Sequence, residues 1–528
     1  MIVAPRHGDR RAGAERRRTA GPWSGRDRRA GIDRRKGERR HGFGRRAGAL
    51  TVPRRFPDSG PAAVPRGRVL AESGIVAGAV FALALLIGLG LESRDVLVPY
   101  SVGSFSSSWS TWHAPPGSDL ALGYDEPPLL PLLELPFTVD TAIAQRLTVL
   151  PVVSAVIGGA LAGIVNAVLA GFRVPTLPRL VATALIVLNP AWLYFTTTGL
   201  PTVGGMMAVL AGFYGLVNWL RFGNLLWILV SSAGLALGVV AWYPVTTWAI
   251  GAVVLLVAVL VARRRPVAET FGVLLIYALP LVFTMGVWTL VVVAGTGDVP
   301  PWLSSAPPGA GIGTSTLDFA LLLAPLAVAM VVALAVYVPR RPDAVGAGVA
   351  LFLLVPLLIA VLRRALDPEA NAGAGSLFYV ILPTVAIIVT ASVYAELGRR
   401  LRIVVSTTLA VLLVAGNALL LGWMLDGSGR PVNDFARFVT GRPLTASVPP
   451  AVEVGRWLDE NATAGRVAVA AGVDERSQQT VAMMAGMPDL LQPPERPPLW
   501  LVHVAGTPVP GGFEPAFSSG GLEVVART

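Results

Sequence analysis

The sequence has no cysteine and few charged side chains. The absence of cysteine excludes disulfides, thiolate metal sites and cysteine nucleophiles. Charged residues make up 14% of the 528 residues and hydrophobic ones 53%, whereas soluble globular domains carry roughly 25% charged residues. A chain so poor in charge and rich in apolar residues is typical of proteins embedded in lipid, so the composition predicts an integral membrane protein.

Positive charge is concentrated at the start of the chain. Residues 1–70 contain 20 basic and 6 acidic side chains, a net charge of +14, whereas the whole chain carries +11. This tail repeats an acid followed by two arginines and has few apolar residues, which predicts disorder. It is expected to bind the anionic lipid of the cytoplasmic leaflet, or merely to fix topology as a solvated tail. Nucleic-acid binding by the membrane body is not indicated, because that part is not basic.

Apolar runs close to the ~20 residues needed to cross a bilayer recur along residues 71–425. The first begins too far from Met1 to be a cleavable signal peptide. The sequence thus predicts an all-α bundle of about eleven transmembrane helices, at residues 71–91, 146–171, 180–197, 203–220, 224–241, 245–262, 271–294, 317–338, 345–362, 376–394 and 403–423.

Basic loops predict the orientation of this bundle, because cytosolic loops are enriched in arginine and lysine. With eleven spans, five basic clusters fall on the side of the tail: Arg173 with Arg179, Arg221, Arg263 to Arg265, Arg340 with Arg341, and Arg399, Arg400 with Arg402. The N-terminus is therefore expected in the cytosol and the C-terminus outside. Arg363 and Arg364 fall on the outer side, against the rule.

Two further parts are expected outside the membrane. The loop at residues 92–145 is far longer than the ~12 to 15 residues beyond which loops are usually functional or disordered, and its tryptophans, prolines and acids favour an ordered structure. Residues 426–528 have a mixed polar composition that predicts a small α/β domain. Helices are expected at 452–461 and 478–485, and strands at 466–471, 499–504 and 522–526.

The outer loop also concentrates the residues that can carry chemistry. It contains Glu92, Asp95, Trp112, His113, Asp119, Asp125 and Glu126. A carboxylate at the mouth of a helix bundle can act as a general base or ligate a hard divalent cation, and tryptophan can stack on sugar rings. The alternative for each acid is that it caps a helix or faces water.

This layout resembles the GT-C class of integral-membrane glycosyltransferases, which have acids early in a large first outer loop, many further spans and an exported C-terminal domain. The run Trp112 to Asp119 is also similar to a Trp-His, Gly-Ser-Asp pattern in actinobacterial envelope glycosyltransferase-like proteins. The resemblance implies Asp95 as catalytic base, with Glu92 as the neighbouring acid. His113, Asp119, Asp125, Glu126 and Trp112 would hold the acceptor or a divalent cation, and Arg363 and Arg364 would bind phosphate.

The resemblance implies an enzyme of a bacterial plasma membrane that transfers sugar from a polyprenyl-phosphate-linked donor to a glycan or lipid acceptor, in cell-envelope assembly. Two other functions stay open. A transporter or lipid flippase would be favoured by ionisable residues inside the spans, where only Asn166, Asn189 and Asn218 stand out. A non-catalytic envelope assembly factor would bind a partner through its exported domain.

Overall fold

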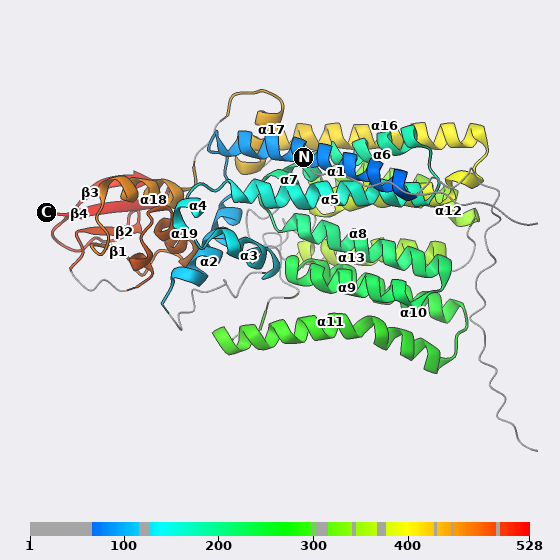
Figure 1. Cartoon of the computed structure of the whole chain (residues 1–528), viewed down its shortest axis with the longest axis horizontal. Helices are drawn as coiled ribbons and strands as arrows, with labels where there is room; N and C mark the ends of the chain where they lie inside the picture. The colour runs from blue at the N-terminus through cyan, green and yellow to red at the C-terminus, as the bar shows by residue number, and fades with distance from the viewer. Residues whose placement is uncertain are drawn as a thin grey trace, which may run out of the picture. The chain divides into compact units, whose positions relative to one another are not determined.

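The chain forms a bundle of membrane-length helices followed by a small sheet domain (Figure 1). The computed structural model describes residues 66–115, 127–297, 299–300, 302, 315–340, 345–366, 376–426, 430–444, 448–492 and 497–528. The predicted disorder of the tail therefore falls, up to residue 65, outside the described residues. The helices of the bundle are α1 (Arg66–Glu92), α5 (Val149–Gly171), α6 (Thr176–Val187), α7 (Pro190–Thr197), α8 (Thr202–Phe222), α9 (Leu225–Ala241), α10 (Val245–Ala262), α11 (Val267–Thr296), α12 (Thr316–Tyr337), α13 (Val345–Leu366), α15 (Phe378–Val393) and α16 (Arg399–Asp426).

The predicted membrane bundle is confirmed. In the described part of the chain, eight helices have the length and hydropathy of a membrane span, and the bent pair α6 and α7 makes a ninth. Two shorter apolar stretches, Leu225–Ala241 and Val349–Leu362, coincide with the two remaining expected spans. The chain is a multi-pass membrane protein, and each of the eleven expected segments is helical.

Glycines allow α1 and α5 to pack closely. On α5, Gly159 and Gly163 form a Gly-x-x-x-Gly pattern of the kind that brings membrane helices into backbone contact. A Cβ on Gly159 would lie 2.7 Å from the carbonyl oxygen of Ala77, and one on Gly163 would lie 2.9 Å from that of Ser73. No side chain larger than hydrogen fits either position without moving α1.

The span made of α6 and α7 bends by 67° at its break. Asn189 satisfies the backbone there, because its Oδ1 accepts hydrogen bonds from the amides of Ala191 and Trp192, at 3.0 and 3.2 Å. Its Nδ2 donates to Oδ1 of Asn417 on α16 at 2.7 Å. Broken helices within a membrane bundle need such internal partners, and the asparagine noted in the sequence provides them.

A charged cluster lies inside the bundle near the start of α1. Arg179 is fully buried on α6; its Nη2 donates to Glu72 on α1, and its Nε to Oδ1 of Asn166 on α5, at 2.9 Å. Asn166 in turn donates to Ser73 at 3.0 Å. The expectation that Arg179 belongs to a cytosolic loop was therefore wrong. Helix α6 begins four residues earlier than expected, because Thr176 follows Pro175 and both fit a helix start.

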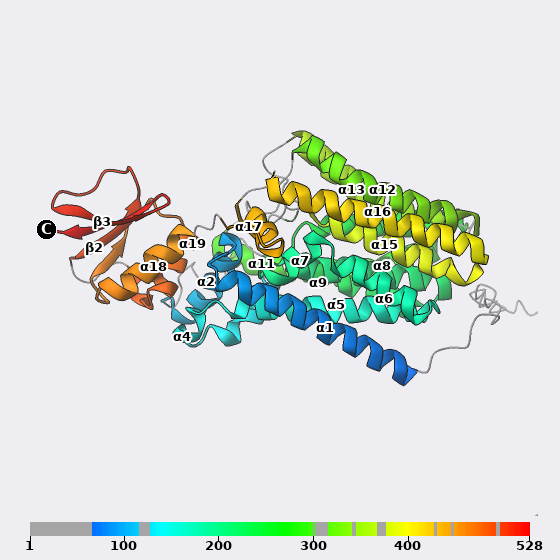
Figure 2. The same ribbon diagram turned by 90° about the horizontal axis from the view of Figure 1, so that it is seen from above.

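The C-terminal part is α/β, as expected (Figure 2). It contains α17 (Arg430–Val439), α18 (Pro450–Asn461), β1 (Val467–Val469), α19 (Glu475–Met484), β2 (Trp500–Val504), β3 (Phe513–Ser519) and β4 (Leu522–Arg527). The sheet order is β1-β2-β4-β3, with β1 and β2 parallel and the other pairs antiparallel.

Two of these elements were not expected from the sequence, α17 and β3. Strand β3 contains Pro515, which argues against a strand in the middle of a sheet, but it lies at the sheet edge with a register shift beside that proline, where proline is tolerated. It forms a hairpin with β4 through Gly520 and Gly521. Both glycines have positive φ, which two-residue hairpin turns favour.

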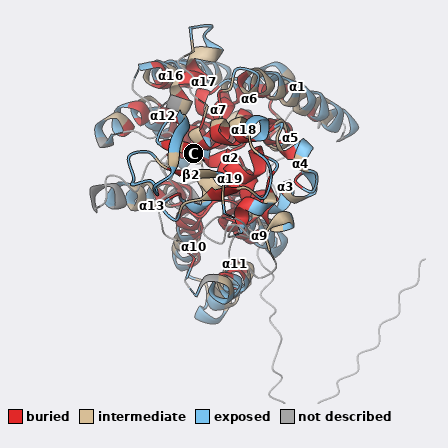
Figure 3. Cartoon of the chain, turned by 90° about the vertical axis from the view of Figure 1, so that its left-hand side faces the viewer, coloured by how far each residue is buried: buried red, intermediate tan, exposed pale blue. Residues whose placement is uncertain are grey.

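The outer loop is ordered in its described residues and packs into the C-terminal domain. It contains α2 (Pro99–His113), α3 (Leu129–Glu134), a 3-10 turn (Leu135–Phe137) and α4 (Thr141–Ala144). Phe105 and Trp109 of α2 share one hydrophobic core with Val452 of α18 and Val524 of β4. Figure 3 shows the end of the molecule that bears the strands, with α2 and α19 coloured as buried. Loop and domain are thus one packed unit, although the sequence presents them separately.

Candidate functional site

Asp95 lies directly after α1, in a backbone conformation that side chains rarely adopt. Its φ is 58°, in the left-handed region. Its amide donates to the carbonyl of Glu92 at 2.9 Å, and the amide of Val96 donates to that of Leu91 at 2.9 Å. This pair of bonds is a Schellman helix end, in which the left-handed residue is usually glycine. Aspartate tolerates this conformation better than most side chains do.

In the described part of the chain, the same helix end occurs with a residue other than glycine at two further places, with Arg173 after α5 and Arg264 after α10, at φ 60° and 50°. The conformation of Asp95 is therefore a way in which this chain ends helices and is not by itself a sign of catalysis. What distinguishes Asp95 is the chemistry of its side chain and the group that contacts it.

Asp95 is paired with an arginine from the C-terminal domain. Nη1 of Arg456 on α18 donates to Oδ1 of Asp95 at 2.9 Å. The side chains are 42% and 46% exposed respectively, so the pair lies at the surface and leaves Oδ2 of Asp95 unused by this bond. Glu92 is half-buried one turn earlier. The two acids predicted from the sequence therefore lie together beside a guanidinium that the sequence did not identify.

A second arginine of the domain lies over the start of α2. The guanidinium of Arg476 on α19 is 5.3 Å from the ring centroid of Tyr100, and a Cβ on Gly103 would lie 3.5 Å from Cδ of the same arginine. The Tyr100 ring meets Trp242 of the bundle edge-on, with 6.4 Å between ring centroids. Asp95 and Tyr100 are five residues apart, within about 17 Å by chain length. Two guanidinium groups therefore border the segment that follows α1.

The helix α2 is polar and yet buried on most of its surface. The hydroxyl of Ser107 donates to Oε1 of Gln479 at 2.7 Å, and Ser106 lies 3.1 Å from the hydroxyl of Thr480. Both partners are on α19. Buried polar groups need such partners, so these serines fix how α19 and its Arg476 sit on the loop.

His113 ends α2, and its environment differs from that of its neighbour Trp112. The His113 ring lies against Trp109, with 4.6 Å between centroids, and its Nε2 is buried without a hydrogen-bond partner among the described residues. Trp112 is exposed and donates to the carbonyl of Leu135 at 2.9 Å. The acids expected to join them, Asp119, Asp125 and Glu126, lie outside the described residues.

Arg363 and Arg364 lie in the last turn of α13. Their side chains are outside the described part of the structure, so their expected approach to Asp95 stays a prediction. A divalent cation is a prediction too. Among the described residues, no three acids or histidines are grouped to hold a metal ion, and the acids proposed as ligands are not among those residues.

Glu134 was missed by sequence reasoning, as were Arg456 and Arg476. It ends α3 with a fully buried side chain, next to Pro131, whose carbonyl accepts a hydrogen bond from Ser108 at 3.2 Å. Its one sequence signal is that it is a single acid in the apolar run from Leu129 to Phe137. The two arginines give no such signal, since polar surface helices commonly carry arginine.

No model of a known protein family matches the chain, and neither does any curated protein. Among solved structures, the chain is similar to ArnT from Cupriavidus metallidurans bound to undecaprenyl phosphate, with 11% identity and a TM-score of 0.47 over 88% of this chain and 98% of that one. It is also similar to apo ArnT from the same source, with 12% identity and a TM-score of 0.44 over 85% and 98%.

Proposed function

We propose that the chain is a membrane glycosyltransferase that uses a polyprenyl-phosphate-linked sugar donor. The observation that carries the proposal is the position of Asp95, at the mouth of the bundle, on an ordered outer loop and in contact with Arg456. A carboxylate that is half exposed and held by a surface ion pair is accessible to an acceptor hydroxyl. The resemblance of the loop to GT-C enzymes names the same residue as base.

In the proposed reaction, the acceptor oxygen attacks the anomeric carbon while the bond from that carbon to the phosphate oxygen breaks. Asp95 takes the hydroxyl proton, for which it has to approach within ~3 Å of the hydroxyl, directly or through one water. The electron pair of the broken bond leaves on the polyprenyl phosphate. Glu92 is the second acid of the site.

The leaving phosphate needs positive charge where its negative charge develops. Arg363 and Arg364 are the groups proposed from the sequence. Arg456 and Arg476 add to them, since both border the segment after α1. His113, Trp112, Asp119, Asp125 and Glu126 are proposed to hold the glycan or lipid acceptor, and the acids a divalent cation where one takes part.

The proposed compartment follows from charge. From the basic loops we infer that the N-terminus is in the cytosol and that the loop and C-terminal domain lie outside a bacterial plasma membrane, where a cell-envelope glycan would be assembled. The basic tail would bind anionic lipid on the inner side.

An envelope assembly factor without catalysis is the second candidate, and one observation favours it. The outer loop and the C-terminal domain form a single core, as a partner-binding module would. A transporter is favoured less. The break between α6 and α7 is capped by its own Asn189, whereas substrate sites of transporters often use the free ends of broken helices.

The test is the reaction itself. Purified full-length protein, supplied with polyprenyl-phosphate-linked sugars and a crude envelope acceptor, is expected to release polyprenyl phosphate as it forms product. Asp95→Asn should lower the rate by about 100-fold or more, as loss of a general base does. Asp140→Asn is the matched control, because Asp140 caps α4 and asparagine caps as well. Equal activity of Asp95→Asn and wild type, or no turnover of any donor, would contradict the proposed catalysis and favour the assembly-factor function.

A further inference from the structure

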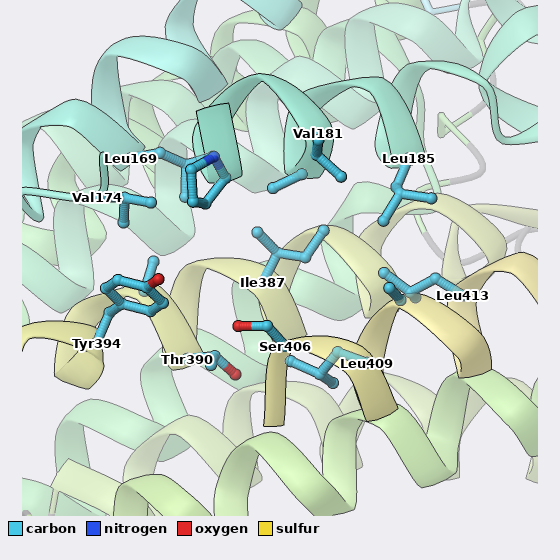
Figure 4. Close-up of a pocket in the computed structure, with 14 residues that line it drawn as sticks. Leu169, Val174, Val181, Leu185, Ile387, Thr390, Tyr394, Ser406, Leu409 and Leu413 are labelled. Carbon is cyan, nitrogen blue, oxygen red and sulfur yellow. The ribbon is translucent and has the colours of Figure 1, made fainter. Parts of the chain in front are cut away.

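An apolar groove lies in the wall of the bundle between α5 and α6 on one side and α15 and α16 on the other (Figure 4). Its walls include Val181 and Leu185 of α6, Ile387 of α15, and Leu409 and Leu413 of α16. Val181 is exposed, so the groove opens at the lipid-facing surface. A groove of this kind is filled by an apolar chain when the protein is in a membrane.

The groove is not uniformly apolar. Figure 4 shows Tyr394, Thr390 and Ser406 in one half of it and Leu185 and Leu413 in the other. The Thr390 side chain is 95% buried, and its Oγ1 has no hydrogen-bond partner among the described residues. Threonine in a helix usually donates to the carbonyl four residues earlier. Thr390 does not, so this wall of the groove contains a buried hydroxyl whose donor is unused by the described residues.

A guanidinium lies at the polar end. The Arg402 side chain stacks over the Tyr394 ring, 5.3 Å from its centroid, and is held by the carbonyls of Leu397 and Ala395 at 2.6 and 3.2 Å. No acid is paired with Arg402 in the described residues. Arg399 and Arg400, exposed in the same turn, add positive charge.

The polar groups are stacked in levels. Thr390 on α15 is one helical turn before Tyr394, which follows the end of that helix, and Ser406 is one turn after Arg402 on α16. Each hydroxyl therefore lies about 6 Å deeper than the charged end. The apolar residues continue from there. From the end of the helices inward, the groove thus has the guanidinium of Arg402, then the hydroxyls of Thr390 and Ser406, and then apolar side chains.

We propose that this groove binds an anionic glycerophospholipid. The phosphate lies at Arg402, an ester carbonyl accepts a hydrogen bond from Thr390, and the acyl chain lies along Val181, Ile387 and Leu409. The hydrogen bond from Thr390 to an ester carbonyl is what distinguishes this ligand. A polyprenyl phosphate has a phosphate and a hydrocarbon chain but no carbonyl that could accept this bond. A zwitterionic phospholipid has the carbonyl but lacks the net charge.

This site is separate from the one at Asp95. Pro178, in the groove wall, is adjacent to Arg179, which contacts Glu72 of α1. Glu72 and Glu92 are twenty residues apart on one helix, which corresponds to about 30 Å. The groove is therefore near the opposite end of α1 from Asp95, and the proposal does not depend on the proposed function.

Native mass spectrometry of the purified full-length protein tests the site with four probes: dioleoyl phosphatidylglycerol, its ether-linked analogue, dioleoyl phosphatidylcholine and undecaprenyl phosphate. Wild type is expected to bind phosphatidylglycerol about tenfold more tightly than phosphatidylcholine, as a hydrogen bond to a charged group allows. Arg402→Gln should remove this preference. Thr390→Val should weaken the ester lipid about fivefold, the effect of one neutral hydrogen bond, and leave the ether lipid unchanged.

Two matched controls address folding and surface charge. Arg264→Gln removes an exposed arginine at another helix end and should leave the preference intact. Ala410→Phe fills the groove and should displace phosphatidylglycerol, whereas Ala418→Phe, exposed on the same helix, should not. The proposal is wrong if Arg264→Gln acts like Arg402→Gln, if Ala410→Phe leaves binding unchanged, or if undecaprenyl phosphate binds as tightly as phosphatidylglycerol and ignores Thr390→Val.

Discussion

Arg456 on α18 donates a hydrogen bond to Asp95 after α1, at 2.9 Å, although 361 residues separate the two along the chain. The proposed base therefore has its partner in the C-terminal domain, not in the loop that carries it. Its position depends on both parts being folded and packed together.

Arg456→Gln is expected to lower transfer while changing stability little. The pair is about half exposed, and such pairs contribute roughly 0.2–1 kcal/mol, so the unfolding temperature in detergent should stay close to that of wild type. Initial rates of transfer should fall, because Asp95 loses the group that orients it. Arg527→Gln, an exposed arginine of the same domain, is the control. Equal rates in the two variants would show that Arg456 has no part in the reaction.

Arg363→Ala is expected to act on the donor. A guanidinium that binds the phosphate of both donor and transition state contributes mostly to KM. We expect KM for the lipid-linked donor to rise about tenfold, since a hydrogen bond to a charged group is worth roughly 1.5–3 kcal/mol. Steady-state kinetics with varied donor measure this. A fall in kcat at constant KM would assign Arg363 to the charge that develops on the leaving phosphate, and unchanged KM and kcat would contradict any role in the reaction.

Glu72→Gln should destabilise the bundle strongly. It leaves the fully buried Arg179 without its carboxylate, and a buried charge that loses its partner is strongly destabilising. The double variant Glu72→Gln with Arg179→Met should recover part of the loss. Thermal unfolding measures both. Glu269→Gln, which breaks the exposed pair with Arg265, is the control, and an equal effect there would contradict the buried-pair argument.

Gly159→Ala should loosen the contact of α1 with α5. The added Cβ would meet the backbone of Ala77 at 2.7 Å, which cannot move aside as a side chain would, and overpacking of this kind costs about 1–3 kcal/mol. Gly78→Ala adds the same group with nothing within 4 Å, and is expected to be neutral or mildly stabilising. If both variants unfold alike, the close approach is unimportant.

Reporter fusions test the orientation. Alkaline phosphatase joined after Thr528 should be active and a fluorescent protein there dark, because the basic loops predict that the C-terminal domain is outside. Deletion of residues 1–64 should leave this pattern unchanged, since Arg66 and Arg68 still precede the first span. The reverse pattern would mean an even number of spans.

The sequence was enough to predict the bundle and most of the C-terminal elements, because apolar runs and period-two patterns are local. It also placed Asp95 and Glu92 at the mouth, next to the first span. Arg456, Arg476 and the buried side chain of Glu134 could not be predicted. Their roles depend on which distant segments pack together, and no local pattern encodes the pairing of α2 with α19. Arg179 was assigned to a loop because of its charge. The helix start at Pro175 and Thr176, four and three residues earlier, was given less weight.

The order in which the chain is made has a consequence for the outer loop. Ser107 bonds to Gln479, which is 372 residues later in the chain. At about 5–20 residues per second, ribosomal synthesis takes roughly 20–75 s to cover that distance. During this interval the loop is already outside in the proposed topology, with Phe105 and Trp109 uncovered and Ser107 without Gln479. Any factor that shields newly exported segments would find its binding site on this loop during biogenesis, and would lose it when α19 arrives.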